Sequence, residues 1–350
     1  MKVIKEIVYF IIFVICIFIT IDLLNKIFVP KWIHPEDNMH GYITRGYFAE
    51  EKNSLDVVFM GNSDTFRAIS PMEIWNDHNI TSYNYVSSGQ RMWTAYYMLN
   101  EALKTQKPEV IMLNIDGIFS DNHSSMSNYR KVFDTAKMSK NKITAIMDPA
   151  FDFGIGRKIS LVFPFTTYHT RYNELTKEDF KYAFSDYHNP YKGLDVSVDS
   201  KPFKGEYLEE GSEVFPLNDK VLKYLDMFVD KCKNENIKLE FIWLPSPDSW
   251  KVDRTNAAKE YAQKHDIKYN DLNLIYKDLD IDFEKDTADG GDHLNIYGAK
   301  KVSKYLGDYL NDNYSFKKHN KKIIKEWNKD YKDYVKAIKD YENGESWYLY

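Results

Sequence analysis

The stretch DVVFMGNSD, residues 56–64, joins an apolar run to a Gly-x-Ser turn that leads into a helical pattern. A short apolar run bounded by turn residues is typical of a buried strand, and glycine permits a tight turn after it. Open α/β folds build their sites at the carboxyl ends of their strands. Ser63 is therefore a candidate nucleophile, although a serine that simply caps the following helix fits the same pattern.

The rest of the chain extends this pattern. Further strand-like runs occur at 82–86, 110–115 and 239–244, with helical patterns at 93–105 and 221–234 between them. This alternation predicts an α/β fold with a doubly wound, mostly parallel sheet. Residues from about 120 to 217 break the rhythm and predict a helical insertion, which would shape a surface for a substrate or a partner.

An apolar segment lies close to the N-terminus. Residues 7–24 read IVYFIIFVICIFITIDLL, which is long enough to cross a bilayer, and no A-x-A cleavage site follows. We expect a retained single-pass anchor in the cell membrane. Lysines flank the segment on both sides and do not set its orientation. The very short N-terminal tail favours a domain outside the cytoplasm.

The chain divides accordingly into four parts. The prediction is an anchor at 1–29, an irregular juxtamembrane linker at 30–52, a catalytic domain at 53–314 and a C-terminal amphipathic helix with a tail at 315–350. The C-terminal helix has apolar residues at helical spacing and lysines on its other faces, which is typical of a helix docked on the domain. Contact of the lysine face with lipid headgroups or an anionic polymer is the alternative.

Composition excludes several functions. The 52 acidic and 47 basic residues give a net charge of -5, which does not favour nucleic-acid binding. We expect no disulfide between the two cysteines, no cofactor and no metal site. Asp278, Asp280 and Asp282 have the spacing of a calcium loop, but Phe283 replaces the required glycine, so a strand with a solvated acidic face is expected.

A histidine with carboxylates beside it follows far downstream, in DGGDHLN at 289–295. His293 is the candidate general base for the serine. Asp289 could reach the histidine if the Gly290-Gly291 pair folds the chain back, and it is preferred because neighbouring side chains seldom bond each other well. Asp292 remains the alternative.

Three motifs together resemble the SGNH, or GDSL-type, hydrolase superfamily. They are Gly-x-Ser at the first strand, a glycine after the second strand and a late Asp/His block. The resemblance implies an oxyanion hole formed by the backbone amides of Ser63 and Gly89. Asn114 matches a third contributor by residue type. The superfamily usually has an aspartate three residues before the histidine, and here that position is Gly290.

Three further residues are candidates for substrate binding. Gln90 follows the glycine of the second block, and His169 and Arg171 lie two residues apart in an aromatic part of the insertion. Surface packing is the alternative for the latter pair.

With its tether, the chain is similar to anchored proteins that accompany membrane-bound O-acyltransferases in teichoic-acid D-alanylation and exopolysaccharide O-acetylation. That resemblance implies a relay, in which the membrane partner supplies an acyl group, Ser63 accepts it and a cell-surface polysaccharide or teichoic-acid-like polymer receives it. An esterase acting on the same polymer, or a non-catalytic adaptor for the acyltransferase, fits the same features.

Overall fold

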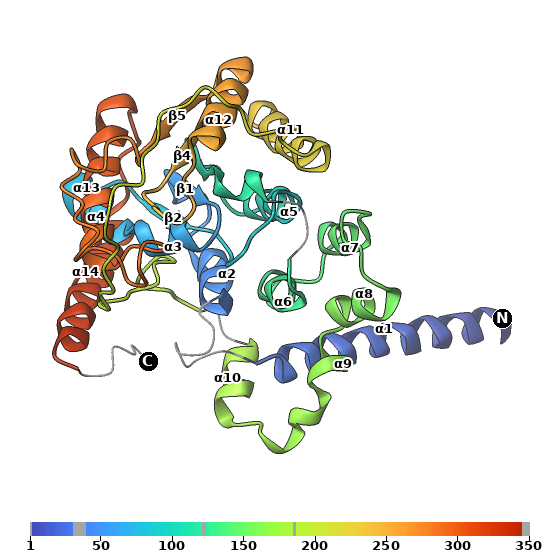
Figure 1. The fold of residues 1–350 in the computed structure, drawn as a ribbon. Helices are drawn as coiled ribbons and strands as arrows, with labels where there is room; N and C mark the ends of the chain where they lie inside the picture. Colours follow the sequence, from blue (N-terminus) through green and yellow to red (C-terminus); the bar gives the residue numbers. More distant parts are fainter. Residues whose placement is uncertain (1, 31–39, 121–123, 185–186, 345–350) are drawn as a thin grey trace.

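The computed structural model describes residues 2–30, 40–120, 124–184 and 187–344 (Figure 1). Its centre is a parallel sheet of five strands in the order β2-β1-β3-β4-β5. The strands are β1 (Val57–Met60), β2 (Ser82–Asn84), β3 (Val110–Asn114), β4 (Lys238–Trp243) and β5 (Lys268–Asp271). The predicted α/β fold is confirmed. The sequence analysis missed β5, because this edge strand contains only one apolar residue and lacks an apolar run.

The two faces of the sheet are covered by different helices. Val58 and Met60 belong to one hydrophobic cluster, and the alternating residues Val57 and Phe59 belong to the other, as the period of a strand requires. The first cluster includes α5 (Met92–Ala102), α11 (Asp219–Asn234) and α12 (Val252–His265). The second includes Ile74 of α4 (Pro71–His78) and Val302 and Leu306 of α13 (Ile296–Asn313), two helices that also contribute residues to the first cluster. The short helix α3 (Ser63–Ala68) connects β1 to α4.

The last helix, α14 (Lys321–Glu342), packs against α4. Trp327 and Tyr334 are buried, and the Trp327 ring lies 5.2 Å from that of Trp75, measured between centroids. The lysines of α14 face solvent. The expected docked amphipathic helix is therefore present.

The N-terminal region contains the expected apolar helix but differs from the expected linker. The apolar helix α1 (Lys2–Phe28) is long enough to cross a membrane, and the apolar window within it is not buried by the rest of the protein. The linker, expected to be irregular, contains α2 (His40–Ala49), whose Ile43 and Tyr47 are fully buried. This short helix contains two glycines and has no extended helical pattern of apolar residues that would identify it in the sequence.

The expected insertion consists of two unlike parts. Its first part is helical, with α6 (Met126–Phe133), α7 (Lys140–Met147), α8 (Ile155–Val162), α9 (Phe165–Tyr168) and α10 (Lys177–Phe184). Residues 187–217 then run across the body without a helix or strand. One further expectation was wrong: residues 278–280 form turns and not a strand, although Leu279 and Ile281 are buried between exposed aspartates.

A buried ion-pair network ties residues 187–217, which we call the return segment, to the two ends of the domain. The fully buried Lys192 places its Nζ 2.7 Å from Glu50 Oε1 and 2.8 Å from Asp330 Oδ2. Burial lowers the pKa of Lys192, but the two carboxylates outweigh it and raise the pKa above its ordinary value. One charge network thus joins Glu50, which follows α2, to the return segment and to α14.

Removing that charge should destabilise the whole domain. We expect Lys192→Met to lower the free energy of unfolding by about 3–5 kcal/mol, because Glu50 and Asp330 would be left buried without their cation. The measurement is denaturant unfolding of the detergent-solubilised chain. The matched control is Lys329→Met, which breaks the exposed pair with Asp333 and should change the free energy by less than about 1 kcal/mol. Equal effects of the two substitutions would contradict a stabilising role for the network.

Candidate active site

The turn after β1 leaves no room for a side chain at Gly61. The φ angle of Gly61 is +148°, and a Cβ there would lie 2.5 Å from Thr65 Oγ1 and 2.8 Å from Asn114 Cβ. Glycine is required by both the backbone and the space. The turn brings Ser63 to the start of α3, at the carboxyl end of the sheet, as the sequence predicted.

A chain of amides fixes this turn. Asn114, the last residue of β3, donates from Nδ2 to Asn62 Oδ1 at 3.1 Å, and Asn62 donates from Nδ2 to Asp116 Oδ2 at 2.6 Å. Asn62 also caps α3, because its Oδ1 accepts the N–H of Asp64 at 3.3 Å. Asn114 is thus brought next to the Ser63 turn, with its amide committed to Asn62; its part in an oxyanion hole stays a prediction.

His293 lies on a loop that folds back on itself. The His293 Nδ1 lies 2.6 Å from Asp289 Oδ2, and the His293 N–H donates to Asp289 Oδ1 at 2.8 Å. Gly290 and Gly291 permit this because their φ angles are +91° and +109°. Asp292 Oδ2 is also 3.2 Å from Nδ1. Both candidate aspartates therefore contact the same ring nitrogen, and Asp289 makes the shorter contact.

The surroundings of the Asp289 carboxyl favour its charged form. Partial burial raises its pKa, but the contacts with the ring and backbone N–H of His293 outweigh this and hold the pKa below its ordinary value. Partial burial raises the pKa of Asp292 instead. The charge that fixes the orientation of the imidazole thus comes chiefly from Asp289.

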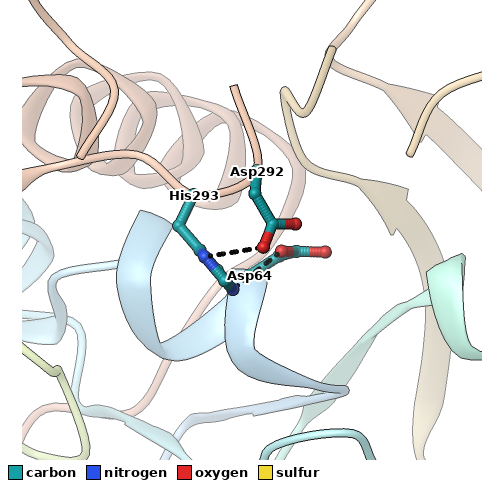
Figure 2. A group of neighbouring side chains, drawn as sticks. All are labelled: Asp64, Asp292 and His293. Atoms are coloured by element: carbon teal, nitrogen blue, oxygen red, sulfur yellow. Dashed lines mark ion pairs between the residues drawn. The ribbon is translucent and has the colours of Figure 1, made fainter. Parts of the chain in front are cut away.

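The other ring nitrogen faces the first turn of α3, as Figure 2 shows. His293 Nε2 lies 3.7 Å from Asp64 Oδ1, and only 8% of the Asp64 side chain is exposed. Burial, followed by the charges of Asp116 and Asp292, raises the pKa of Asp64 well above its usual range. No side-chain hydrogen bond of Ser63 occurs among the described residues, so its hydroxyl is uncommitted.

Sequence reasoning gave Asp64 no role. The residue stands directly after the candidate serine, and the strand-to-helix pattern alone does not reveal which way its side chain turns. In the fold, it faces a histidine that is 229 positions away in the chain. Asn62 was missed for the same reason, since its two partners come from the end of the third strand.

The glycine block lies after β2. Gly89 has a φ angle of +57°, and a Cβ there would lie 2.3 Å from Asn128 Nδ2, so this turn also requires glycine. The Gln90 side chain is buried, with its Nε2 2.6 Å from Met98 Sδ in α5. Its contact is internal, and the expected roles of Gly89 in the oxyanion hole and of Gln90 in substrate binding stay predictions.

His169 and Arg171 lie at the end of α1. Arg171 donates to the carbonyl oxygen of Phe28 at 2.6 Å and to Asp179 Oδ1 at 3.3 Å, and His169 Nδ1 is 3.0 Å from the carbonyl oxygen of Thr166. None of these contacts involves the residues around Ser63. The structure therefore does not bring this pair into the candidate site, and a role in substrate binding has no support from its contacts.

The return segment forms a further wall of the site. Arg67 in α3 pairs with Asp195 at 2.9 Å, and Lys201 donates its backbone N–H to Thr287 at 3.1 Å in the histidine loop. The Phe203 ring lies 3.0 Å from where a Cβ on Gly291 would be. This irregular segment has no periodic pattern, so the sequence could not show that it lies beside the histidine.

Asp64, Asp292 and His293 also have ligand atoms within 4.8 Å of one another, close enough to hold a metal ion.

Solved structures with a similar course of the chain include three hydrolase-like proteins. The first is described as a lipolytic protein of the G-D-S-L family from Desulfitobacterium hafniense, 13% identical, with 73% of this chain and 98% of that chain covered and a TM-score of 0.37. An acylhydrolase from Bacteroides fragilis is also 13% identical, with coverages of 81% and 98% and a TM-score of 0.36. A GDSL-like lipase from Bacteroides thetaiotaomicron is 11% identical, with coverages of 74% and 88% and a TM-score of 0.34. No protein-family model and no curated protein matches the chain.

The buried Asp64 should make stability depend on pH. Its folded-state pKa lies above that of the unfolded chain, so its contribution is fully present below about pH 4 and is lost as pH rises toward the folded pKa, by up to about 1.4 kcal/mol per pH unit. We expect the melting temperature of Asp64→Asn, relative to the unaltered chain, to increase between pH 5 and pH 8. Asp292→Asn, at a half-exposed position, is the control and should show a smaller change. A pH-independent difference for Asp64→Asn would contradict the raised pKa.

Proposed function

We propose that this protein is a membrane-anchored O-acyltransferase that forms an ester on Ser63 and passes the acyl group, in the simplest case acetyl, to a cell-surface polysaccharide or teichoic-acid-like polymer. One observation carries the proposal. Asp289 holds Nδ1 of His293, while Nε2 faces the helix turn that begins with Ser63. A serine, a histidine and an orienting carboxylate are the parts that acyl transfer through a covalent intermediate requires.

In the first step, the Ser63 Oγ attacks the acyl carbonyl and His293 Nε2 accepts the hydroxyl proton. Backbone amides of Ser63 and Gly89 are the proposed donors to the oxyanion, which such donors stabilise by about 3–4 kcal/mol each. His293 returns the proton to the leaving oxygen as the carbon–oxygen bond to the donor breaks. An acceptor hydroxyl then attacks the ester and gives its proton to Nε2, which passes the proton to Ser63 Oγ as the bond between that oxygen and the acyl carbon breaks.

In its neutral form, Asp64 is compatible with these proton transfers. An ionised carboxylate 3.7 Å from Nε2 would hold the imidazolium and hinder return of the proton. The raised pKa of Asp64 favours the protonated carboxyl, which carries no charge to trap that proton. Burying the Asp64 carboxyl costs free energy, and such costs are common at functional sites.

The helix α1 supports a location at the membrane. Its length and apolar composition suit a single span, and its apolar window is not covered by the described residues. We propose that α1 anchors the protein with the domain outside the cytoplasm, beside a membrane-bound O-acyltransferase that supplies the acyl group. Anchoring keeps the donor and the polymer close to one site.

Hydrolysis is the second candidate, and a specific observation favours it. Asp289 and Asp292 beside the histidine have 43% and 53% of their side chains exposed, so water has access to this side of the site. Water attacking the Ser63 ester by the same steps would make the protein an esterase for the same polymer.

The proposed function is tested by measuring how much of the acyl group reaches the polymer and how much reaches water. The full chain in detergent is incubated with an activated acetyl ester and a teichoic-acid or polysaccharide acceptor. We expect more acetylated polymer than free acetate, and a loss of at least about a thousandfold in Ser63→Ala. Ser200→Ala, at an exposed position, is the control and should be unchanged. Full activity in Ser63→Ala would contradict the proposed intermediate, and acetate as the main product would favour the esterase.

The two aspartates should differ in their effects on turnover. We expect Asp289→Asn to lower kcat by about 100- to 10,000-fold, because it removes the charge that orients His293, with little change in KM. Asp292→Asn should lower it less than tenfold, since its contact with Nδ1 is 3.2 Å against 2.6 Å for Asp289. Steady-state rates on the activated ester measure both. A larger loss in Asp292→Asn would reverse the assignment.

A further inference from the structure

The helical part of the insertion carries an unusual concentration of exposed apolar side chains. Outside α1, thirteen large apolar residues are exposed in the described chain, and eight of them lie between positions 138 and 184. These include Ile155 and Ile159 on α8 and Phe180 and Phe184 on α10. We call residues 137–184 the shoulder. Apolar groups gathered in this way mark a surface that is covered in the working protein.

The shoulder is attached to the end of the anchor. The backbone N–H of Phe165 donates to Asn25 Oδ1 at 2.9 Å, and the ring of Phe165 packs edge-on against Phe28 with centroids 5.0 Å apart. Arg171 binds the carbonyl oxygen of Phe28. Figure 1 shows α9 and α10 beside this end of α1, with the sheet on the other side of α2. The exposed apolar residues are thus continuous with the proposed membrane helix.

The length of α1 places the shoulder at the edge of the bilayer. Residues 3–20 are exposed apart from the half-buried Val14, whereas most residues from 21 to 28 are partly covered. At about 1.5 Å per residue, the exposed stretch spans about 27 Å; its uncharged part, residues 7–20, spans about 21 Å of the ~30 Å thickness of a hydrocarbon core, with Lys5 and Glu6 at its N-terminal end. The first polar pair, Asp22 with Lys26 at 2.7 Å, follows directly. The boundary between hydrocarbon and headgroups therefore falls where the shoulder begins.

The charge of the shoulder suits anionic headgroups. Residues 137–184 contain eight lysines and arginines against five acidic residues, whereas the whole chain has a net charge of -5. Lys140, Arg157 and Lys181 are exposed on the same helices as the apolar residues. Helices that combine apolar and basic residues in this way bind at the interface of anionic membranes.

We propose that the shoulder lies on the bilayer surface, with the apolar residues of α7, α8 and α10 at the acyl-chain boundary and its basic residues among anionic phosphate headgroups. This inference rests on the proposed anchoring by α1. A second attachment beside the span restricts the rotation of the domain, so that the site around Ser63 keeps a constant orientation toward the membrane. Lipid is favoured over a protein partner because the apolar surface is continuous with α1 and carries excess positive charge.

The test uses the full chain in nanodiscs of phosphatidylcholine and phosphatidylglycerol. In a background of Cys16→Ser and Cys232→Ala, a polarity-sensitive fluorophore is placed by Ile159→Cys or Phe184→Cys. Phe13→Cys in the anchor is the positive control, and Leu274→Cys, an exposed apolar position outside the shoulder, is the matched negative control. We expect a blue-shifted emission and quenching by brominated lipid at positions 159, 184 and 13, and neither effect at 274.

The outcomes separate the inference from the anchoring on which it rests. Quenching at position 13 with water-like emission at 159 and 184 would overturn the shoulder proposal alone. Water-like emission at position 13 would overturn the anchoring itself. A blue shift at 159 and 184 without lipid quenching would mean that protein covers the shoulder, which overturns the proposed occupant. Quenching that is unchanged when phosphatidylglycerol is omitted would overturn the role of the basic residues.

Discussion

The close approach of β1 and β3 at Gly61 is the constraint on which the candidate site depends. Because a Cβ at this position would collide with Thr65 and Asn114, the two strand ends can meet only around a glycine. Their contact allows the amide chain from Asn114 through Asn62 to Asp116, and it starts α3 at Ser63. In the order β2-β1-β3-β4-β5, this contact is also the point where the chain reverses its direction across the sheet, which is where open α/β sheets bind ligands.

The second half of the site is a loop whose shape also depends on glycines. Gly290 and Gly291 adopt positive φ angles, and this lets Asp289 reach both the ring and the backbone N–H of His293. The return segment, through Phe203, packs against this loop, and the pair of Arg67 with Asp195 ties the same segment to α3. One irregular segment thus contacts both the helix that begins with Ser63 and the loop that carries His293.

The sequence was sufficient for strands β1 to β4 and for the two motifs, because buried strands and glycine turns leave local patterns. The same patterns indicated that Asp289 could fold back on His293. They could not reveal β5, an edge strand without an apolar run, or α2, whose burial depends on distant partners. Asp64 was missed because the direction of its side chain depends on how α3 packs. For His169 and Arg171 the sequence left binding and surface packing open; Arg171 contacts the end of α1 and α10, and His169 contacts Thr166 of α9. Such long-range contacts have no signature in local spacing.

The central claim is that His293 activates the hydroxyl of Ser63. It is tested most directly by treating the full chain with a fluorophosphonate, which reacts with activated serine hydroxyls, and locating the adduct by peptide mass spectrometry. The account predicts a single adduct on the peptide containing Ser63, formed rapidly in the unaltered chain and lost in His293→Ala. An adduct that forms equally fast in folded His293→Ala, or no adduct at Ser63 in the unaltered chain, would contradict it.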